Sequence, residues 1–462
     1  MNTTPGDWLS RESRRLHGNL VVAACLWGQR RVPFSSRRRI DARRDAAVRR
    51  IVRYAARTVP YYRDLFRREG IGPETIRGAR DLARLPLLER GLVREHPELF
   101  VSTGRRARGA LPFLTSGSTG SPLEVRHDRR SLLANIAFGE RERQPLIALC
   151  GGSFSPKEVY IGYETSNFRK VLRFYEENTR LPIRPRRITV PMTAPFERIV
   201  ESINLHRPDV LTAYGGFVDL FFRSVAARGA HLHLPKVVMY VGETLEPERR
   251  AWIEGRFGVR VLSRYCAAEA FKIGYFCEEA TGFHLHEDIC HVRIVGDDGQ
   301  DKAPGEAGQV VVSNLVNRAT VLLNYPMGDV AKLSMRTCPC GRRFRLLSEL
   351  EGRVEDALAL PGGDFLHPRA VWSVLKDETD VLQYQLVQHE LRRFELKLVT
   401  VDANAFPAAA ERMARRLGDL MGRGAHIDVT QHSELGRRER ETTGKFRAVE
   451  SRCRFTGDAS PR

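Results

Sequence analysis

The sequence contains no apolar run long enough to cross a bilayer. The run Leu20–Trp27 is too short for a membrane-spanning helix, and the amino-terminal region lacks an apolar segment followed by a small-residue cleavage site. We therefore expect a cytoplasmic protein without a membrane partner.

Cysteine is scarce, with eight residues among 462. A reducing compartment disfavours a disulfide framework, so each cysteine is a core residue, a metal ligand or a reactive thiol. We interpret Cys25, Cys150 and Cys453 as core residues.

Acidic residues are outnumbered, with 56 Asp and Glu against 75 Lys and Arg, and the formal net charge is +19. The surplus is scattered, and its densest clusters, such as Arg37–Arg39, are short. A surface that reads nucleic acid more often shows a basic stripe with interleaved aromatic residues. We therefore do not expect a nucleic-acid partner, and a positive field also suits a small polyanion.

The stretch Leu114–Leu123 has no Gly-Lys-Ser/Thr sequence, so it is not a Walker loop. Hydroxyl residues and glycines alternate there, between an apolar strand at 110–114 and an extended run at 123–126. Backbone N–H groups and hydroxyls can converge on one point in such a loop, which favours polyphosphate binding over a flexible linker. The candidate residues are Thr115, Ser116, Gly117, Ser118, Thr119 and Gly120.

Strand and helix patterns alternate along the chain, which indicates a layered α/β fold with its site at the carboxyl ends of strands. The length exceeds what one core usually holds, so we expect two domains. Residues 44–66 have helical spacing with a break at Val59–Tyr62, and further helices are expected at 131–141, 195–204, 215–228 and 247–256. Expected strands are 146–149, 159–162, 210–214, 237–241, 259–262 and 292–295.

Four of the expected strand ends carry polar or aromatic residues. They are Tyr214–Phe217, Gly242–Glu243, Tyr265–Glu269 and Tyr325–Asp329. Together they can hold a nucleotide, with Tyr265 against a base, Glu269 on Mg²⁺ and Asp329 accepting from ribose hydroxyls. Taken singly, each tyrosine also suits a core position and each carboxylate a helix cap.

These motifs, in this order, resemble the adenylate-forming superfamily, and more closely its branch of phenylacetate-CoA ligase, coenzyme F390 synthetase and capsule-biosynthesis proteins. The similarity covers nearly the whole chain. Besides the stretches above it includes 48–92, Gly282–Asp288, Cys338–Gly341, Glu351–Asp356 and Thr443–Lys445.

The resemblance implies a large multi-layer α/β amino-terminal domain, 1–351, that binds ATP and the acid. A small mobile α+β lid, 352–462, follows, with a hinge near Glu355. The pattern beyond the hinge agrees with an α+β domain, because 381–387, 394–401 and 427–430 favour strands and 408–421 favours a helix.

The resemblance also implies residue roles. The hydroxyl loop, Gly242, Glu243, Tyr265 and Asp329 would bind the nucleotide, with Glu269 on Mg²⁺. Arg353 would contact the nucleotide, and Lys445 would reach from the lid to stabilise adenylation. The acyl pocket would include Tyr214, Gly215, Phe217, Ala267 and Ala268, and this small, apolar lining suits a planar ring or a medium-chain acid.

Two positions depart from the superfamily pattern. Leu123 stands where many members carry a lysine, and Asn324–Met327 replaces a stretch that bears an arginine. The second change affects the expected contacts on the ribose side, although Asp329 is retained.

Cys277, His284, Cys338 and Cys340 supply four soft ligands, and several members of the similar branch carry a structural zinc there. Four protein ligands complete the tetrahedron of a structural zinc site. Unligated buried thiols are the alternative, and His286 and Cys290 are substitute ligands.

The sequence therefore predicts an ATP-dependent ligase that forms an acyl-AMP from an aromatic carboxylic acid, releases pyrophosphate and transfers the acyl group to coenzyme A. One alternative passes the acyl group to an amine or a carrier protein. Another is a non-catalytic binding protein on this fold. The resemblance also favours a homodimer.

Overall fold

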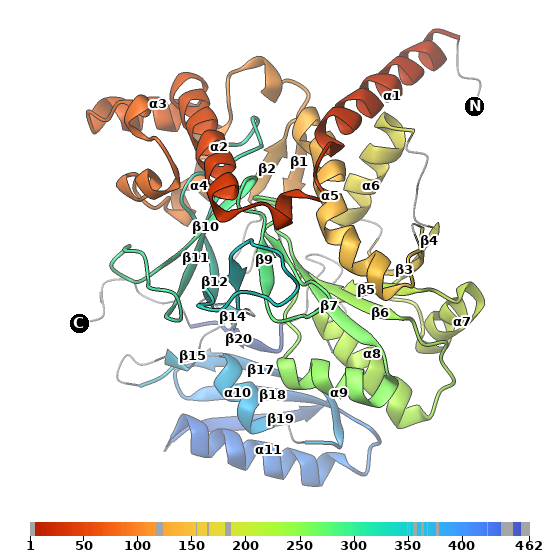
Figure 1. Cartoon of the computed structure of the whole chain (residues 1–462). Coiled ribbons are helices and arrows are strands. Elements are labelled where there is room, and N and C mark those ends of the chain that lie inside the picture. Colours follow the sequence, from red (N-terminus) through yellow and green to blue (C-terminus); the bar gives the residue numbers. More distant parts are fainter. Residues whose placement is uncertain are drawn as a thin grey trace.

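The computed structural model describes residues 5–115, 123–153, 155–163, 166–180, 186–348, 350, 352–353, 358–361, 365–366, 368–375, 378–422, 424–435 and 447–453. It is a mixed α/β structure with a separate carboxyl-terminal sheet (Figure 1), as predicted. Among the helices in these ranges, none combines the length and hydropathy that a bilayer crossing requires.

The chain begins with helices on the outside of the molecule. They are α1 (Pro5–Leu26), α2 (Arg37–Thr58), α3 (Pro60–Arg68) and α4 (Arg90–Glu95). Short 3₁₀ turns connect them at Val32–Phe34, Pro73–Thr75, Ala79–Arg84, Pro97–Phe100 and Arg105–Ala107. The break between α2 and α3 falls at Val59, as predicted, because Pro60 ends one helix and occupies the first turn of the next.

The largest sheet has eight strands in the order β13-β9-β8-β7-β6-β5-β3-β4. Its parallel part consists of β3 (Lys157–Gly162), β4 (Arg186–Pro191), β5 (Val210–Tyr214), β6 (Val237–Val241) and β7 (Arg260–Tyr265). The antiparallel part adds β8 (Gly274–Tyr275), β9 (Phe283–Leu285) and β13 (Leu346–Leu347).

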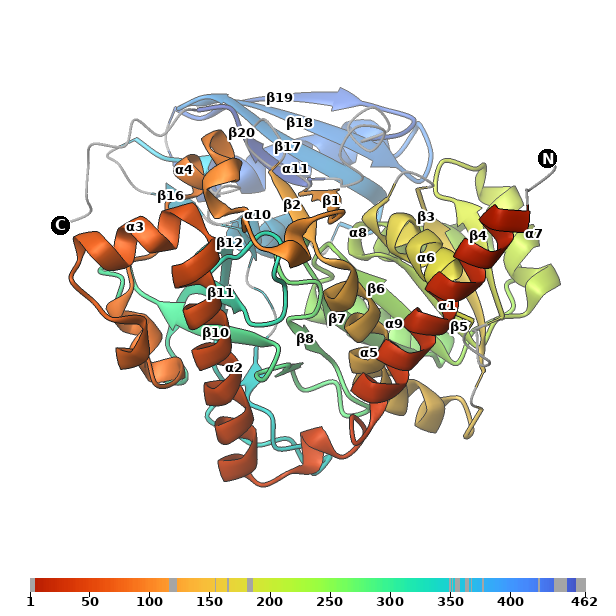
Figure 2. The same cartoon turned by 90° about the horizontal axis from the view of Figure 1, so that it is seen from above.

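Helices cover both faces of this sheet (Figure 2). On one face, α7 (Phe196–His206), α8 (Gly215–Arg228) and α9 (Pro247–Phe257) share a core with alternate residues of the strands. On the other face lie α5 (Arg129–Leu149) and α6 (Asn167–Asn178), with α1 packed against both. The parallel strands are therefore buried on both faces, which explains their continuous apolar runs.

The expected strand at Leu146–Leu149 is wrong. These residues continue α5, whose first turn is capped by the Asp128 carboxylate, which accepts from the N–H groups of Arg130 and Ser131. The helix also passes through Pro145. A short apolar run does not distinguish a strand from a buried helix, and burial of Leu146 against the sheet favours the helix here.

A second sheet is antiparallel and has the order β10-β11-β12-β14, with β10 Cys290–Val295, β11 Ala307–Asn314, β12 Tyr325–Lys332 and β14 Gly352–Arg353. The expectation that Tyr325–Asp329 closes a strand is therefore wrong, because these residues lie inside β12. The polar residues suggested a strand end, but β12 pairs antiparallel with β11 on one side and β14 on the other, so these residues belong to a strand.

Two short strands, β1 (Leu111–Leu114) and β2 (Glu124–His127), pair on either side of the hydroxyl loop. Their register places Leu114 opposite Glu124. The two strands therefore form a hairpin, and their pairing fixes the base of the hydroxyl loop.

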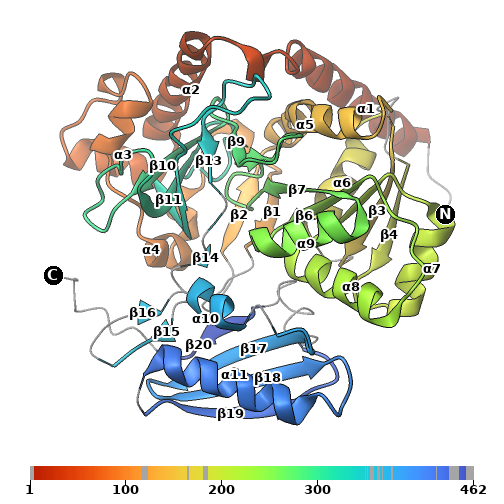
Figure 3. The same ribbon diagram turned by 60° about the horizontal axis from the view of Figure 1, so that its bottom comes forward.

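The carboxyl-terminal part folds around its own sheet, in the order β19-β18-β17-β20 (Figure 3). The strands are β17 (Val381–Glu390), β18 (Arg393–Thr400), β19 (His426–Gln431) and β20 (Val449–Ser451), with a small pair β15 (Leu358–Ala359) and β16 (Phe365–Leu366) beside them. Helices α10 (Pro368–Leu375) and α11 (Phe406–Met421) complete a separate core.

Arg223 joins this part to the rest of the chain. The Arg223 guanidinium on α8 donates to the carbonyl oxygens of Val381 and Leu382 at the start of β17, the latter at 2.8 Å. Asp219 and Arg249 lie next to Arg223, and the half-buried Tyr384 lies near the same group of charges.

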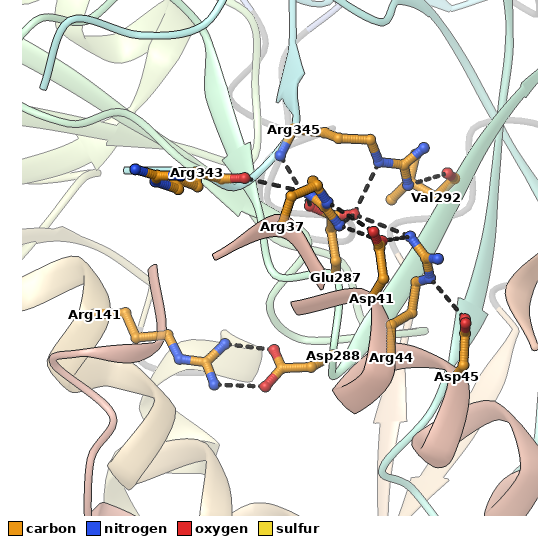
Figure 4. Close-up of polar contacts among 10 residues, drawn as sticks. All are labelled: Arg37, Asp41, Arg44, Asp45, Arg141, Glu287, Asp288, Val292, Arg343 and Arg345. Atoms are coloured by element: carbon orange, nitrogen blue, oxygen red, sulfur yellow. Dashed lines mark hydrogen bonds and ion pairs between the residues drawn. The ribbon is translucent and has the colours of Figure 1, made fainter. Parts of the chain in front are cut away.

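A buried ion network fixes α2 to the turn between β9 and β10 (Figure 4). The Glu287 side chain is fully buried and accepts from Arg37 at 2.6 and 2.8 Å and from Arg345 at 2.9 Å. Arg44 lies 3.4 Å from the same carboxylate. Asp288, the next residue, forms a two-pronged pair with the buried Arg141 at 2.7 and 2.9 Å.

Glu287 therefore provides the first test. Burial opposes its ionisation, but Arg345 and Arg37 outweigh this, so the pKa of Glu287 lies below its ordinary value of 4.5. Glu287→Gln removes the buried carboxylate that Arg37, Arg44 and Arg345 share, although Arg37 and Arg44 keep Asp41, and it should lower the free energy of unfolding by about 3–5 kcal/mol in chemical denaturation at pH 7.

The matched control is Glu201→Gln, which breaks an exposed ion pair with Arg198; the Arg198 side chain is 73% exposed and the Glu201 side chain 53%. This substitution should lower the free energy of unfolding by roughly 0–1 kcal/mol. A carboxylate with a lowered pKa stabilises the fold above the unfolded-state pKa and loses this contribution as the pH falls through the folded-state value. The gap between wild type and Glu287→Gln should therefore narrow below pH 4.5. Equal effects of the two substitutions would contradict the assignment.

Candidate active site

Three of the predicted motifs meet at one edge of the parallel sheet. In the strand register, the Cα of Tyr214 pairs with that of Val241, which in turn pairs with that of Arg264. The residues that follow, Gly215, Gly242 and Tyr265, therefore lie side by side where β5, β6 and β7 end. Residues from three separate strands can act on one ligand at such an edge.

Gly215 permits the closest approach at this edge. A Cβ atom on Gly215 would lie 2.7 Å from the carbonyl oxygens of both Glu243 and Thr244. One oxygen of the Glu243 carboxylate accepts from the Gly216 N–H at 2.9 Å, in the first turn of α8. Glu243 therefore fixes the strand-to-helix turn after Tyr214, a contact that the sequence did not predict.

The two sheets meet at Tyr265 and Asp329. The Tyr265 hydroxyl donates to Oδ2 of Asp329 at 2.5 Å, and both side chains are buried. In β12 the Cα of Asp329 pairs with that of Arg353 in β14. Three candidate residues that are far apart in sequence are thus brought to one junction.

Glu269 lies close to this junction. Its backbone carbonyl accepts from Asn314 Nδ2 at 2.9 Å, which holds the segment after β7 against β11. Burial, and then the charge of Glu269, raise the pKa of Tyr325, so the carboxylate and this phenol lie near each other.

Arg90 also reaches this place, and nothing in the sequence pattern pointed to it. Its guanidinium on α4 hydrogen-bonds to Tyr325. Asn324, which departs from the superfamily pattern, has a left-handed backbone (φ 55°). Its side-chain amide donates to the carbonyl oxygens of Leu82 and Leu85 at 2.7 and 2.9 Å. The stretch before Asp329 is therefore anchored to the segment that precedes α4.

The base of the hydroxyl loop adjoins the same edge. The Leu123 N–H donates to Thr115 Oγ1 at 3.0 Å, and the Thr115 N–H donates to the Leu123 carbonyl at 2.9 Å. His127 Nε2 lies 2.7 Å from the carbonyl oxygen of Ala268. Since burial lowers the pKa of His127 to about 4, its ring is neutral at pH 7 and Nε2 donates in this bond. The hairpin is thereby joined to the segment of Ala267 and Ala268.

The expected acyl-pocket residues differ in exposure. Ala267 and Ala268 are half-buried, and Tyr214 lies 6.2 Å from the Tyr163 ring, centroid to centroid. Phe217 packs into the core under α8, where its ring stacks on Phe221 at 5.7 Å, and is only 8% exposed. Tyr214 and the two alanines are therefore better placed than Phe217 to contact a ligand.

Several predicted residues lie outside the described residues. They are Ser116, Gly117, Ser118, Thr119, Gly120, the hinge residue Glu355 and Lys445. For Arg353 the structure gives the backbone but not the side chain.

The four predicted metal ligands lie together. The ligand atoms of Cys277, His284, Cys338 and Cys340 are all within 4.8 Å of one another. His284 Nε2 is 3.4 Å from the Cys340 sulfur, and the sulfurs of Cys277 and Cys338 are 3.5 Å apart. Three sulfurs and one imidazole match the ligand type and number of a closed zinc site.

The substitute ligands are not in this set. His286 Nε2 lies 3.0 Å from Glu142, and Cys290 is buried in the main core. Glu142 also accepts from Lys272 at 2.7 Å. This buried ion cluster was not predicted, because its members lie far apart along the chain.

No protein-family model matches the chain. Among curated proteins, it is similar to the phenylacetate-coenzyme A ligase of Thermus thermophilus, with 26% identity over 442 residues, covering 89% of this chain and 96% of the relative. It is also similar to the phenylacetate-coenzyme A ligase of Aromatoleum evansii, with 24% identity over 418 residues, covering 87% and 92%.

Among solved structures, the fold resembles 2-hydroxyisobutyryl-CoA ligase in the postadenylation state in complex with R3-HIB-AMP. The TM-score is 0.72 at 18% identity, covering 91% of each chain. The comparisons confirm the fold of adenylate-forming ligases and the resemblance to the phenylacetate-CoA ligase branch.

Proposed function

We propose that this chain is an AMP-forming carboxylate-CoA ligase that activates an aromatic carboxylic acid with ATP. The observation that carries the proposal is the junction of Tyr265, Asp329 and the backbone of Arg353 at the edge where β5, β6 and β7 end. Its support is the similarity to phenylacetate-CoA ligases over most of both chains. The unpaired state of all eight cysteines, each within the described residues, agrees with a cytoplasmic enzyme.

In the first half-reaction, a carboxylate oxygen of the acid attacks the α-phosphorus of ATP. The new O–P bond replaces the bond between the α-phosphorus and the bridging oxygen, and pyrophosphate leaves with the electron pair. Tyr265 lies against the adenine, and Asp329, oriented by the Tyr265 hydroxyl, accepts from the ribose. The hydroxyl loop holds the β- and γ-phosphates.

Charge builds up on the phosphates in this step. Glu269 would hold the Mg²⁺ that accompanies ATP, and the ion would supply positive charge at the phosphate oxygens. Lys445 adds a second positive charge from the lid. Both groups stabilise the transition state more than the bound substrates.

In the second half-reaction, the sulfur of coenzyme A attacks the acyl carbonyl carbon. A thioester forms, the bond to the AMP oxygen breaks, and the thiol proton is released. Rotation about Glu355 removes Lys445 from the site and admits the thiol. The contact of Arg223 with the start of β17 would have to break in such a rotation.

We assign Ala267, Ala268 and Tyr214 to the acyl pocket, and the small side chains of the two half-buried alanines suit a planar ring. The test is acid-dependent pyrophosphate release across benzoates, anthranilates, phenylacetates and aliphatic acids, with and without coenzyme A. We expect the highest rates with an aromatic acid and thioester only when coenzyme A is present. Absence of release with every acid would leave only the non-catalytic alternative. Pyrophosphate release without thioester formation would indicate that the acyl group goes to an acceptor other than coenzyme A.

We further propose a structural zinc at Cys277, His284, Cys338 and Cys340, supported by the donor set and its close grouping. Such a site would tie the segment after β12 to the turn before β9. Cys338→Ser should abolish zinc binding measured by elemental analysis and lower the melting temperature. The matched control is Cys290→Ser, a buried thiol outside the set, which should lose stability but keep its zinc. Wild-type protein without zinc would reject the site.

Lys445 distinguishes the two half-reactions. Lys445→Ala should slow acyl-adenylate formation by about two to four orders of magnitude, because it removes one preorganised charge from the transition state. A synthetic acyl-adenylate should still react with coenzyme A at close to the wild-type rate. Equal loss in both half-reactions would assign Lys445 to the stability of the lid instead.

Tyr265→Phe tests the junction itself. The substitution removes a hydrogen bond to a carboxylate, worth about 1.5–3 kcal/mol, and should raise the KM for ATP about tenfold or more with little change in the KM for coenzyme A. Tyr54→Phe is the matched control, because its hydroxyl bonds to Ser102 at 2.7 Å outside the site. If both variants behave alike, the Tyr265 bond serves only the fold.

A further inference from the structure

Helix α1 is fixed to the protein by one side. A Cβ atom on Gly18 would lie 1.9 Å from the carbonyl oxygen of Asn178, so the helix touches the end of α6 directly. Asn19 donates to the Arg180 carbonyl at 3.3 Å and accepts from the Arg180 N–H at 2.9 Å. Val22 is buried in a cluster with Leu132 and other residues of α5. The rotation of α1 about its axis is therefore set by the fold.

The opposite side of α1 is apolar. Leu16 and Leu20 are each 63% exposed, and Trp27, just after the helix, is 91% exposed. Ala23 and Ala24 are exposed on the same side. A surface helix of a globular protein normally turns its charged side outward. We call this side of α1 the α1 face (Leu16, Leu20, Ala23, Ala24 and Trp27). It exposes apolar side chains where charged ones are expected.

The sequence around the α1 face is basic, although Arg15 pairs with Glu12 at 3.2 Å and Arg30 with Glu140 at 3.0 Å. No Asp or Glu occurs between Glu12 and Asp41. The same stretch holds seven arginines: Arg14, Arg15, Arg30, Arg31, Arg37, Arg38 and Arg39. Of these, Arg14, Arg30, Arg31, Arg38 and Arg39 are exposed.

We propose that the α1 face docks on an anionic lipid bilayer. Tryptophan and leucine on one side of a helix, flanked by arginines, match the interface between lipid headgroups and acyl chains, into which such a face enters by about 5–10 Å. The arginines attract the negative headgroups. A second copy of the chain would bring two such basic stretches together, so charge repulsion disfavours self-association through this face.

The position of α1 leaves the proposed catalytic parts free. In Figures 1 and 3, α1 lies on the side of the molecule away from the carboxyl-terminal sheet and α11. A protein held by the α1 face would therefore keep its carboxyl-terminal part away from the bilayer. We expected no membrane partner because Leu20–Trp27 is too short to span a bilayer. A helix that docks on the bilayer surface does not need that length.

Co-sedimentation of the full chain with lipid vesicles tests this proposal independently of the reaction. We expect binding to vesicles of phosphatidylcholine mixed with phosphatidylglycerol, weak binding to phosphatidylcholine alone, and weakening by salt. The triple variant Leu16→Ser, Leu20→Ser, Trp27→Ser should bind the anionic vesicles at least about tenfold more weakly than the wild type, because it lacks the apolar side chains that enter the interface. Its melting temperature should stay close to that of the wild type, since all three side chains are exposed.

Leu205→Ser is the matched control, because Leu205 is 78% exposed on α7, outside the α1 face, and its loss should leave vesicle binding unchanged. The proposal is overturned if wild-type protein does not bind anionic vesicles, if it binds both lipids equally, or if the triple variant binds like the wild type. A dimer that the triple variant dissociates, without vesicle binding, would assign the α1 face to a second copy and would also overturn it.

Discussion

The hydrogen bond between Tyr265 and Asp329 connects the two sheets from which the candidate site is built. Tyr265 ends the last parallel strand, and Asp329 lies inside an antiparallel strand. Because both side chains are buried, an unpaired carboxylate here would be costly, and the two strands are held in one relative position. Since β12 also pairs with β14, this bond lies beside the backbone of Arg353.

Two further groups hold the region behind this junction. Glu287 joins α2 to Arg345, and the Cys-His set joins Cys338 and Cys340 to the strands before it. Both act on the segment that leads to β13 and β14. A buried carboxylate among three arginines contributes less to net stability than its short contacts suggest, because desolvation opposes the attraction. Its three partners come from α2 and from the residue before β13, so the carboxylate joins these two elements.

The positive charge of the chain is used in different ways in different places. The buried Arg141 and the partly exposed Arg37 are each paired with a buried carboxylate. Around Tyr325, Arg90 supplies a cation that the local sequence lacks. From residue 13 to residue 40 the arginines have no Asp or Glu among them in sequence, and they border an apolar surface on α1. The net charge of +19 is therefore not one uniform field but several local arrangements with different partners.

The sequence by itself determined the motifs, their order and the strands on which most of them lie. The ends of β5, β6 and β7 and the Cys-His set could be predicted, because strand patterns and ligand types are local properties. Only the tertiary structure decided that Leu146 continues α5, that Asp329 lies within a strand, that Arg90 reaches Tyr325 and that the α1 face points outward. Each of these depends on which distant element packs against the residue, and packing between elements far apart in the chain leaves no fixed spacing in the sequence.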